Sequence, residues 1–133
     1  MNELKIEIPS LPENIRIVES FIDSAQEKYE FGDDMYGNVM VAVTESVNNA
    51  ILHGNKSDAK KNVSITLLMD ETKLTFIIAD QGPGFEFDNL PDPTAPENLE
   101  KVGGRGIFLM RNLADDVSFE DEGRKVTIEF KMA

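Results

Sequence analysis

Residues 33–54 read DDMYGNVMVAVTESVNNAILHG and carry the strongest structural signal in the chain. Asp33 or Asp34 can cap the start of a helix, and Gly54 can end it by adopting a positive φ. Residues spaced at 100° form one broad apolar face, made by Met35, Val39, Val43, Val47 and Ala50. We therefore expect a mostly buried helix.

The segments around this helix predict further helices and strands. Residues 4–8 have apolar side chains at every second position and form a short strand that ends at Pro9. A helix follows from Pro12 to about Gly32, and a shorter helix is expected over residues 107–113. Two hairpins are predicted, from the β-rich runs at residues 62–70 and 73–80 and at 117–120 and 125–132.

These elements predict one domain over residues 1–133. Its fold class is an α+β two-layer sandwich, with helices on one face of a mixed, mainly antiparallel sheet. Residues 81–103 contain several glycines and prolines but few apolar anchors, which is typical of a long loop. The length of 133 residues suits one hydrophobic core and is too short for two.

The composition excludes several classes of function. The net charge of -12 opposes direct nucleic-acid binding and binding to anionic membranes. The absence of cysteine excludes disulfides and thiolate chemistry, and no apolar run approaches the roughly 20 residues that span a bilayer. We expect a cytoplasmic protein, in which an anionic ligand would need backbone dipoles and a metal ion.

Three motifs combine residue types suited to ligand chemistry. Glu45 and Asn49 stand one turn apart on the long helix and can address the same small volume. Asp80 begins DQGPGF at the end of an apolar strand, where glycines permit close backbone approach. GGRGIFLM, residues 103–110, places exposed amides before a helix, and the charge of Arg105 suits a phosphate contact.

Each motif alone also has an ordinary explanation. A spaced pair of polar residues can simply reach solvent, DxGxG can be a turn, and a glycine run can be a hinge without a ligand. His53, the only histidine, follows Asn49 by one turn, and a histidine at a helix end more often interacts with local carbonyls than acts in catalysis. The three motifs together are far more specific.

In this order, ESVNNA, DQGPGF and GGRGIFL resemble the N-box and the two glycine boxes of the GHKL ATPases, the superfamily of gyrase and histidine kinases. The resemblance covers nearly the whole chain. It is closest to the small anti-sigma factor serine/threonine kinases, and residues 41–56, VAVTESVNNAILHGNK, are especially similar to their helix. The resemblance implies a site for ATP and Mg2+.

The resemblance also implies a role for individual residues. Glu45 would act as the general base, and Asn49 would ligate Mg2+ through its amide oxygen. Asp80 would read the adenine amino group, assisted by Thr127 on the last strand. Four glycines would line the nucleotide, namely Gly82, Gly84, Gly104 and Gly106.

The function implied is an ATP-dependent serine/threonine kinase that phosphorylates an anti-sigma factor antagonist. Such a kinase would also sequester a sigma factor or a similar regulator, and the family resemblance suggests a homodimer. One alternative is a nucleotide-dependent partner-binding module that transfers no phosphate, which the behaviour of a Glu45 variant would separate from a kinase. Another alternative is an ATPase fragment of a histidine kinase.

Overall fold

The computed structural model of the protein describes residues 2–82 and 104–132. Within them, the strands form one sheet in the order β1-β2-β3-β5-β4, and each neighbouring pair is antiparallel. The described sheet is therefore antiparallel throughout and not mixed. The strands are β1 (Asn2–Pro9), β2 (Asn62–Met69), β3 (Lys73–Ala79), β4 (Asp116–Glu120) and β5 (Lys125–Lys131).

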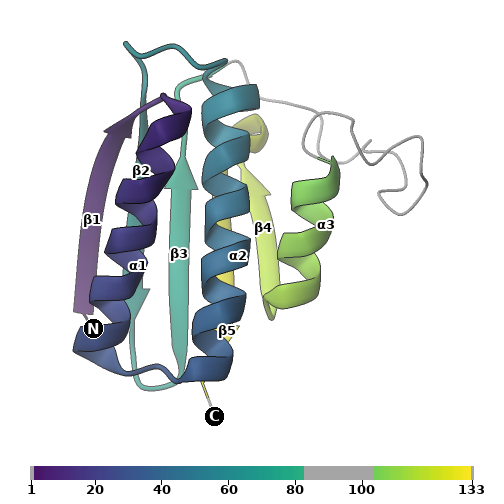
Figure 1. Ribbon diagram of the computed structural model, residues 1–133. Helices are drawn as coiled ribbons and strands as arrows, with labels where there is room; N and C mark the ends of the chain where they lie inside the picture. The colour runs from purple at the N-terminus through teal and green to yellow at the C-terminus, as the bar shows by residue number, and fades with distance from the viewer. Residues whose placement is uncertain (1, 83–103, 133) are drawn as a thin grey trace.

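In the part of the chain that the structure describes, three helices cover one face of this sheet, as Figure 1 shows. They are α1 (Ile15–Tyr29), α2 (Asp33–Asn49) and α3 (Gly104–Leu113). A 3-10 turn (Pro12–Asn14) precedes α1, and a π-helical turn (Ala50–Gly54) continues α2. This arrangement confirms the predicted two-layer α+β fold.

The core lies between the helices and the sheet. Val39, Val43 and Val47 are fully buried, which confirms the apolar face predicted for α2. From the sheet, Phe76 and Phe130 meet edge to face with their ring centroids 6.2 Å apart. Such pairs add stability beyond the apolar area that they bury.

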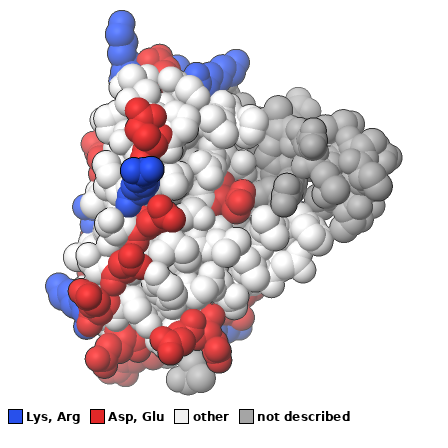
Figure 2. All heavy atoms as spheres, in the orientation of Figure 1, with Lys and Arg blue, Asp and Glu red and all other residues white. Residues whose placement is uncertain are grey.

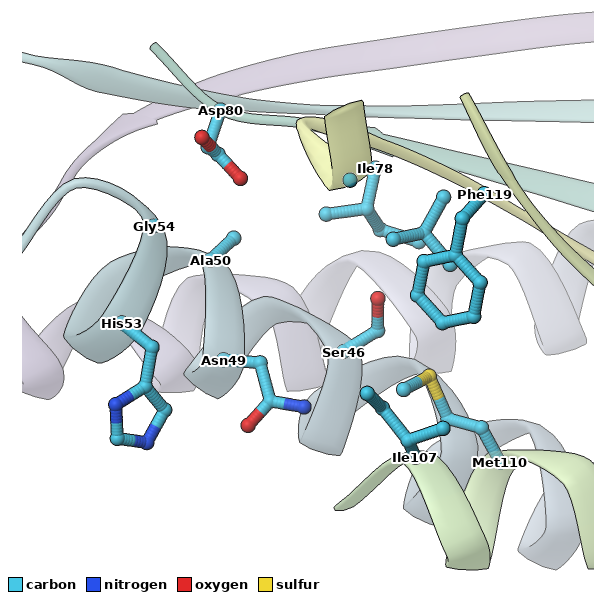
Figure 3. Close-up of a pocket in the computed structure, with 12 residues that line it drawn as sticks. Ser46, Asn49, Ala50, His53, Gly54, Ile78, Asp80, Ile107, Met110 and Phe119 are labelled. Atoms are coloured by element: carbon cyan, nitrogen blue, oxygen red, sulfur yellow. The ribbon is translucent and has the colours of Figure 1, made fainter. Parts of the chain in front are cut away.

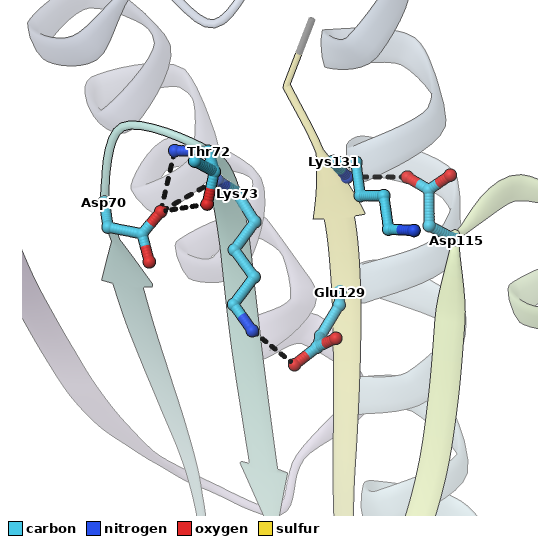
Figure 4. Close-up of polar contacts among 6 residues, drawn as sticks. All are labelled: Asp70, Thr72, Lys73, Asp115, Glu129 and Lys131. Atoms are coloured by element: carbon cyan, nitrogen blue, oxygen red, sulfur yellow. Dashed lines mark hydrogen bonds and ion pairs between the residues drawn. The ribbon is translucent and has the colours of Figure 1, made fainter.

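Polar contacts hold the β2–β3 turn and the C-terminal end of β5. Asp70 Oδ1 accepts hydrogen bonds from Thr72 N at 2.7 Å and Lys73 N at 3.0 Å, which closes the predicted β2–β3 hairpin (Figure 4). These hydrogen bonds favour the charged form and lower the pKa of the Asp70 carboxyl. The backbone N–H of Lys131 donates to Asp115 Oδ2 at 2.6 Å and ties β5 to the connection between α3 and β4.

Two local predictions were wrong. Gly54 does not have a positive φ; among the residues that the structure describes, the glycines that do are Gly32 and Gly123. The chain leaves α2 through a π turn instead, so glycine at position 54 serves a different purpose, which is described with the site. The third helix begins at Gly104 and not at Ile107, so the second glycine motif forms the first turn of α3.

Candidate functional site

The last turns of α2 form one wall of a cavity. Ser46 and Asn49 line it, followed by Ala50, His53 and Gly54 in the π turn. Helical spacing of three and four residues brings these side chains to the same part of the helix surface. Residues of the N-box motif therefore form one wall of the cavity. The polar side chain of Asn49 lies there beside the small residues Ser46 and Ala50, which leave space for a ligand.

The sheet and α3 complete the cavity, which Figure 3 shows in close-up. The cavity has a volume of about 30 Å³, enough for about one or two water molecules. A nucleobase is larger, so binding one requires the walls to shift. The apolar residues that face α2 across it are Ile78, Ile107, Met110, Phe119 and Val126.

Asp80 supplies the acidic group of the cavity. It follows β3 directly, and its backbone N–H donates to Arg124 O at 2.8 Å, which anchors it beside the start of β5. Its Oδ1 accepts from Gly82 N at 2.9 Å. Burial raises the pKa of the Asp80 carboxyl, and the Gly82 hydrogen bond and nearby Arg124 offset part of this rise.

Gly54 and Gly82 allow α2 and the Asp80 segment to approach each other closely. A Cβ on Gly54 would lie 2.5 Å from Asp80 Oδ2, and a Cβ on Gly82 would collide with the carbonyl oxygen of Gly54. An added Cβ would displace the Asp80 side chain at position 54, and at position 82 it would require the backbone of Gly54 to move. The first glycine motif thus acts by bringing the helix end against the acid.

Asn55 holds these two segments in place. Its side chain is buried, its Oδ1 accepts from Gln81 N at 2.7 Å, and its Nδ2 donates to Ser10 Oγ at 2.7 Å and Asn62 O at 3.1 Å. Gln81 in turn accepts from Asn62 N at 2.7 Å. Four separate parts of the chain therefore meet next to Asp80.

The structure brings some of the predicted site residues together. Asn49 and Asp80 line the cavity, and the buried Gly82 packs against Gly54, which also lines it. Glu45 stands one turn before Asn49, half-buried, but it is not among the residues that line the cavity. His53 does line it, with its ring directed away from Asp80 in Figure 3.

Thr127 is not brought to the cavity. Its neighbour Val126 lines the cavity, and successive side chains of a strand point to opposite faces, so Thr127 faces the side of the sheet without helices. The alternation of the apolar residues Val126, Ile128 and Phe130 in the sequence already indicates that Thr127 points away from the core. Val126 is the residue of β5 that faces the cavity of Asp80.

The remaining predicted residues belong to the glycine motifs. Gly104, Arg105 and Gly106 form the first turn of α3, which packs against α2. The first amides of a helix lack partners within the helix and can bind an anion. Gly84 and the side chain of Arg105 lie outside the part of the chain that the structure describes.

Sequence reasoning missed Ser46 and Asn55. Ser46 adjoins Glu45 and precedes Ala50 by one turn, so helical spacing from a residue of the same motif could have found it. Asn55 follows Gly54 in a polar stretch and carries no local signal, because its partners are distant in the sequence.

The sequence of this chain matches a known family. The sequence model of the histidine kinase-like ATPase domain matches residues 8–130, so the chain belongs to that family. The predicted GHKL-type relationship is confirmed, and membership of an ATPase family supports the use of ATP.

Within this ATPase family, the chain is similar to proteins named as serine-protein kinases. The serine-protein kinase RsbW of Bacillus subtilis is 28% identical over an alignment of 124 positions, which covers 89% of this chain and 78% of that protein. RsbW of Listeria monocytogenes is 25% identical over an alignment of 134 positions, which covers 96% of this chain and 85% of that protein. These names agree with the serine/threonine kinase that the family resemblance implies.

A solved structure confirms the fold. The RsbU and RsbW domains of Rv1364c from Mycobacterium tuberculosis give a TM-score of 0.69 at 13% identity. The match covers 99% of this chain and 32% of that one. No helix among residues 2–82 and 104–132 is long and apolar enough to cross a membrane.

Proposed function

We propose that this protein is an ATP-dependent serine/threonine kinase. The adenine base of ATP would bind between α2, the sheet and α3. The observation that carries this proposal is the position of Asp80, a carboxylate in a cavity with otherwise largely apolar walls. An adenine ring has apolar faces and an amino group on one edge, so it suits a carboxylate acceptor among apolar side chains.

Asn49 is the proposed protein ligand of Mg2+. No group of three or more His, Cys, Asp or Glu side chains able to hold a metal occurs in the described part of the chain. Mg2+ commonly takes few protein ligands and completes its shell with water and substrate phosphates, so one amide oxygen on the cavity wall fits this ion. The ion would supply neutralisation of the phosphate charge.

Glu45 is the proposed general base. It lies one turn before Asn49 on the same side of α2, and its half-buried side chain can reach a substrate that approaches the end of the nucleotide. It would take the proton from a serine or threonine hydroxyl as that oxygen bonds to the γ-phosphorus and the bond to the β-phosphate oxygen breaks.

The proposed protein substrate is an anti-sigma factor antagonist, and a sigma factor or similar regulator would be the sequestered partner. The support is the resemblance to anti-sigma kinases and the surface charge. Figure 2 shows acidic side chains gathered along α1 and at its junction with α2. Their exposed members are Glu19, Asp23, Glu27, Glu30, Asp33 and Asp34. A partner with a basic contact surface would associate faster there.

Three further features belong to this proposal. Residues 1–133 would act as one ATP-binding kinase domain, in the cytoplasm, where sigma factors and their regulators meet. The protein would work as a homodimer, as the family resemblance suggests. Size measurement in solution would test the dimer, since a monomer at the concentrations that support activity would contradict it.

The kinase proposal is tested by intact-mass measurement of a candidate antagonist incubated with this protein and Mg-ATP. One added phosphate is expected. Glu45→Gln should slow transfer by about 10²–10⁴-fold, as loss of a general base does, while ATP still binds. Glu71→Gln, in the exposed β2–β3 turn at the other end of β3, is the control and should leave transfer unchanged.

A nucleotide-dependent binding module is the second candidate. It is favoured by one observation, that Glu45 does not line the cavity. In that case ATP would change partner affinity without any change of partner mass, and Glu45→Gln would leave both ATP binding and partner binding intact. Partner binding without phosphate transfer by the wild-type protein would therefore decide for the module.

A further inference from the structure

Ser46 carries a buried hydroxyl that has no hydrogen-bond partner. Its exposed fraction is 2%, and it is the one buried side-chain polar atom in the described residues that lacks a partner. Buried hydroxyls are normally paired, because leaving one unpaired costs stability. An unpaired hydroxyl in this position needs an explanation.

The contrast with neighbouring hydroxyls shows that this is specific to Ser46. Thr44, two residues earlier in α2, donates to Met40 O at 2.6 Å in the preceding turn. Ser10, also fully buried, donates to Lys61 O at 2.6 Å and accepts from Asn55. The protein pairs both of these groups internally, whereas the Ser46 hydroxyl has no such protein partner among the described residues.

The hydroxyl of Ser46 is directed into the cavity. Figure 3 shows its Oγ pointing from α2 towards the sheet, on the side of the helix from which Ala50 also projects. Ile78 and Phe119 are the apolar walls near it, and Asp80 lies on the sheet side of the same cavity. A molecule in this cavity would therefore meet Ser46 and Asp80 together.

We propose that Ser46 binds the nucleobase, through a hydrogen bond from its hydroxyl to the polar edge of the ring, directly or through one water molecule. This inference rests on the proposed nucleotide function of the site. A carboxylate can only accept, but a hydroxyl both donates and accepts. Ser46 can thus satisfy a ring nitrogen of the base, which Asp80 in its charged form cannot do.

The test compares Ser46→Ala with Ser24→Ala by calorimetric titration with ATP and with ADP. Ser24 is an exposed serine within α1, so its replacement reports the gain in helix propensity from serine to alanine. Ser46→Ala should raise the ATP dissociation constant about tenfold, equivalent to about 1.4 kcal/mol. Ser24→Ala should leave it unchanged. ADP should show the same loss, because both nucleotides carry the same base.

The stability of the nucleotide-free variants separates ligand binding from a structural role. Removal of an unpaired hydroxyl should leave the melting temperature of Ser46→Ala at least as high as that of wild type. A clear drop, with no such drop for Ser24→Ala, would mean that Ser46 has a structural partner and would overturn the inference. Ser46→Cys, close to serine in volume, gives a second variant should alanine disturb packing.

The outcomes distinguish this inference from the proposed function. If wild type binds ATP and both Ser46 variants bind it equally well, the inference is wrong and the nucleotide site stands. If the loss appears with ATP but not ADP, Ser46 acts at the phosphates and the assignment to the base is wrong. If wild type binds neither nucleotide, the proposed function itself fails.

Discussion

At the level of a single residue, the Asp80 carboxylate lowers the stability of the folded protein and is the proposed acceptor for the adenine amino group. Burial raises the pKa of its carboxyl, so the folded protein holds the proton more tightly than the unfolded chain does. The resulting cost in stability is present above the raised pKa and disappears as pH falls below the ordinary value. A group that costs stability at neutral pH is often kept for function.

Asp80→Asn tests this cost and this role together. The variant should be at least as stable as wild type at neutral pH, with a difference that shrinks as pH falls, because an amide at this position carries no charge to desolvate. Its ATP affinity should fall about 10–100-fold through loss of a charged hydrogen bond.

Wild-type affinity should weaken as pH falls through the raised pKa of Asp80, whereas the weak binding of the variant should not follow that pKa. Chemical denaturation and calorimetry across pH measure both, and a less stable variant with normal affinity would contradict this account.

At the level of elements, the site depends on how closely the end of α2 approaches the segment after β3. Two glycines permit this approach, and the side chain of Asn55 fixes it. The contacts join segments that are far apart in the sequence, so they depend on the whole sheet being formed. Changes at this junction should therefore affect both nucleotide binding and stability.

Gly54→Ala and Gly37→Ala make a matched pair in one helical segment. Gly37, in α2, has open space where a Cβ would stand, so alanine there should raise stability by about 1 kcal/mol through helix propensity. At Gly54 the added Cβ would meet Asp80 Oδ2 at 2.5 Å and push the carboxylate aside. ATP affinity should then fall about tenfold or more, as in loss of the Asp80 contact. Equal affinity in both variants would show that this close approach is not required.

Asn55→Ala should both destabilise the protein and weaken nucleotide binding. It removes the acceptor of Gln81 N and the donor to the buried Ser10 Oγ, at a cost of about 1–3 kcal/mol. Thermal unfolding and ATP titration measure the two effects. Asn38→Ala, at an exposed position of α2, is the control and should not lower stability, because alanine has the higher helix propensity. A stable Asn55→Ala protein with full affinity would remove Asn55 from the site.

At the level of the whole molecule, periodicity predicted most of the fold. The apolar stripe of α2 and the alternation along the strands have strong local signals, and both meet in the observed core. The site was less accessible to sequence reasoning. Thr127 was predicted to contact adenine because of the family resemblance, although the alternation of apolar residues along β5 directs its side chain away from the core. Gly54 was predicted only to end a helix, because its contact with Asp80 joins residues far apart in the sequence.

The charge of the whole molecule also sets a condition on the site. With 25 acidic and 13 basic residues, the protein repels a free nucleotide, so binding must rely on local contacts and on a counter-ion. ATP affinity should therefore be higher with Mg2+ than with EDTA, and the difference should be reduced by Asn49→Ala. Titrations under both conditions measure this, and an Asn49→Ala protein with the full magnesium effect would contradict the ligand assignment.

The most direct test of the central claim is a calorimetric comparison of ATP and ITP, whose bases differ at the position of the amino group that Asp80 is proposed to read. We predict that the folded protein binds ATP clearly more tightly than ITP and that Asp80→Asn removes most of this preference. Equal affinity of the wild-type protein for the two nucleotides, or no binding of ATP, would contradict the claim.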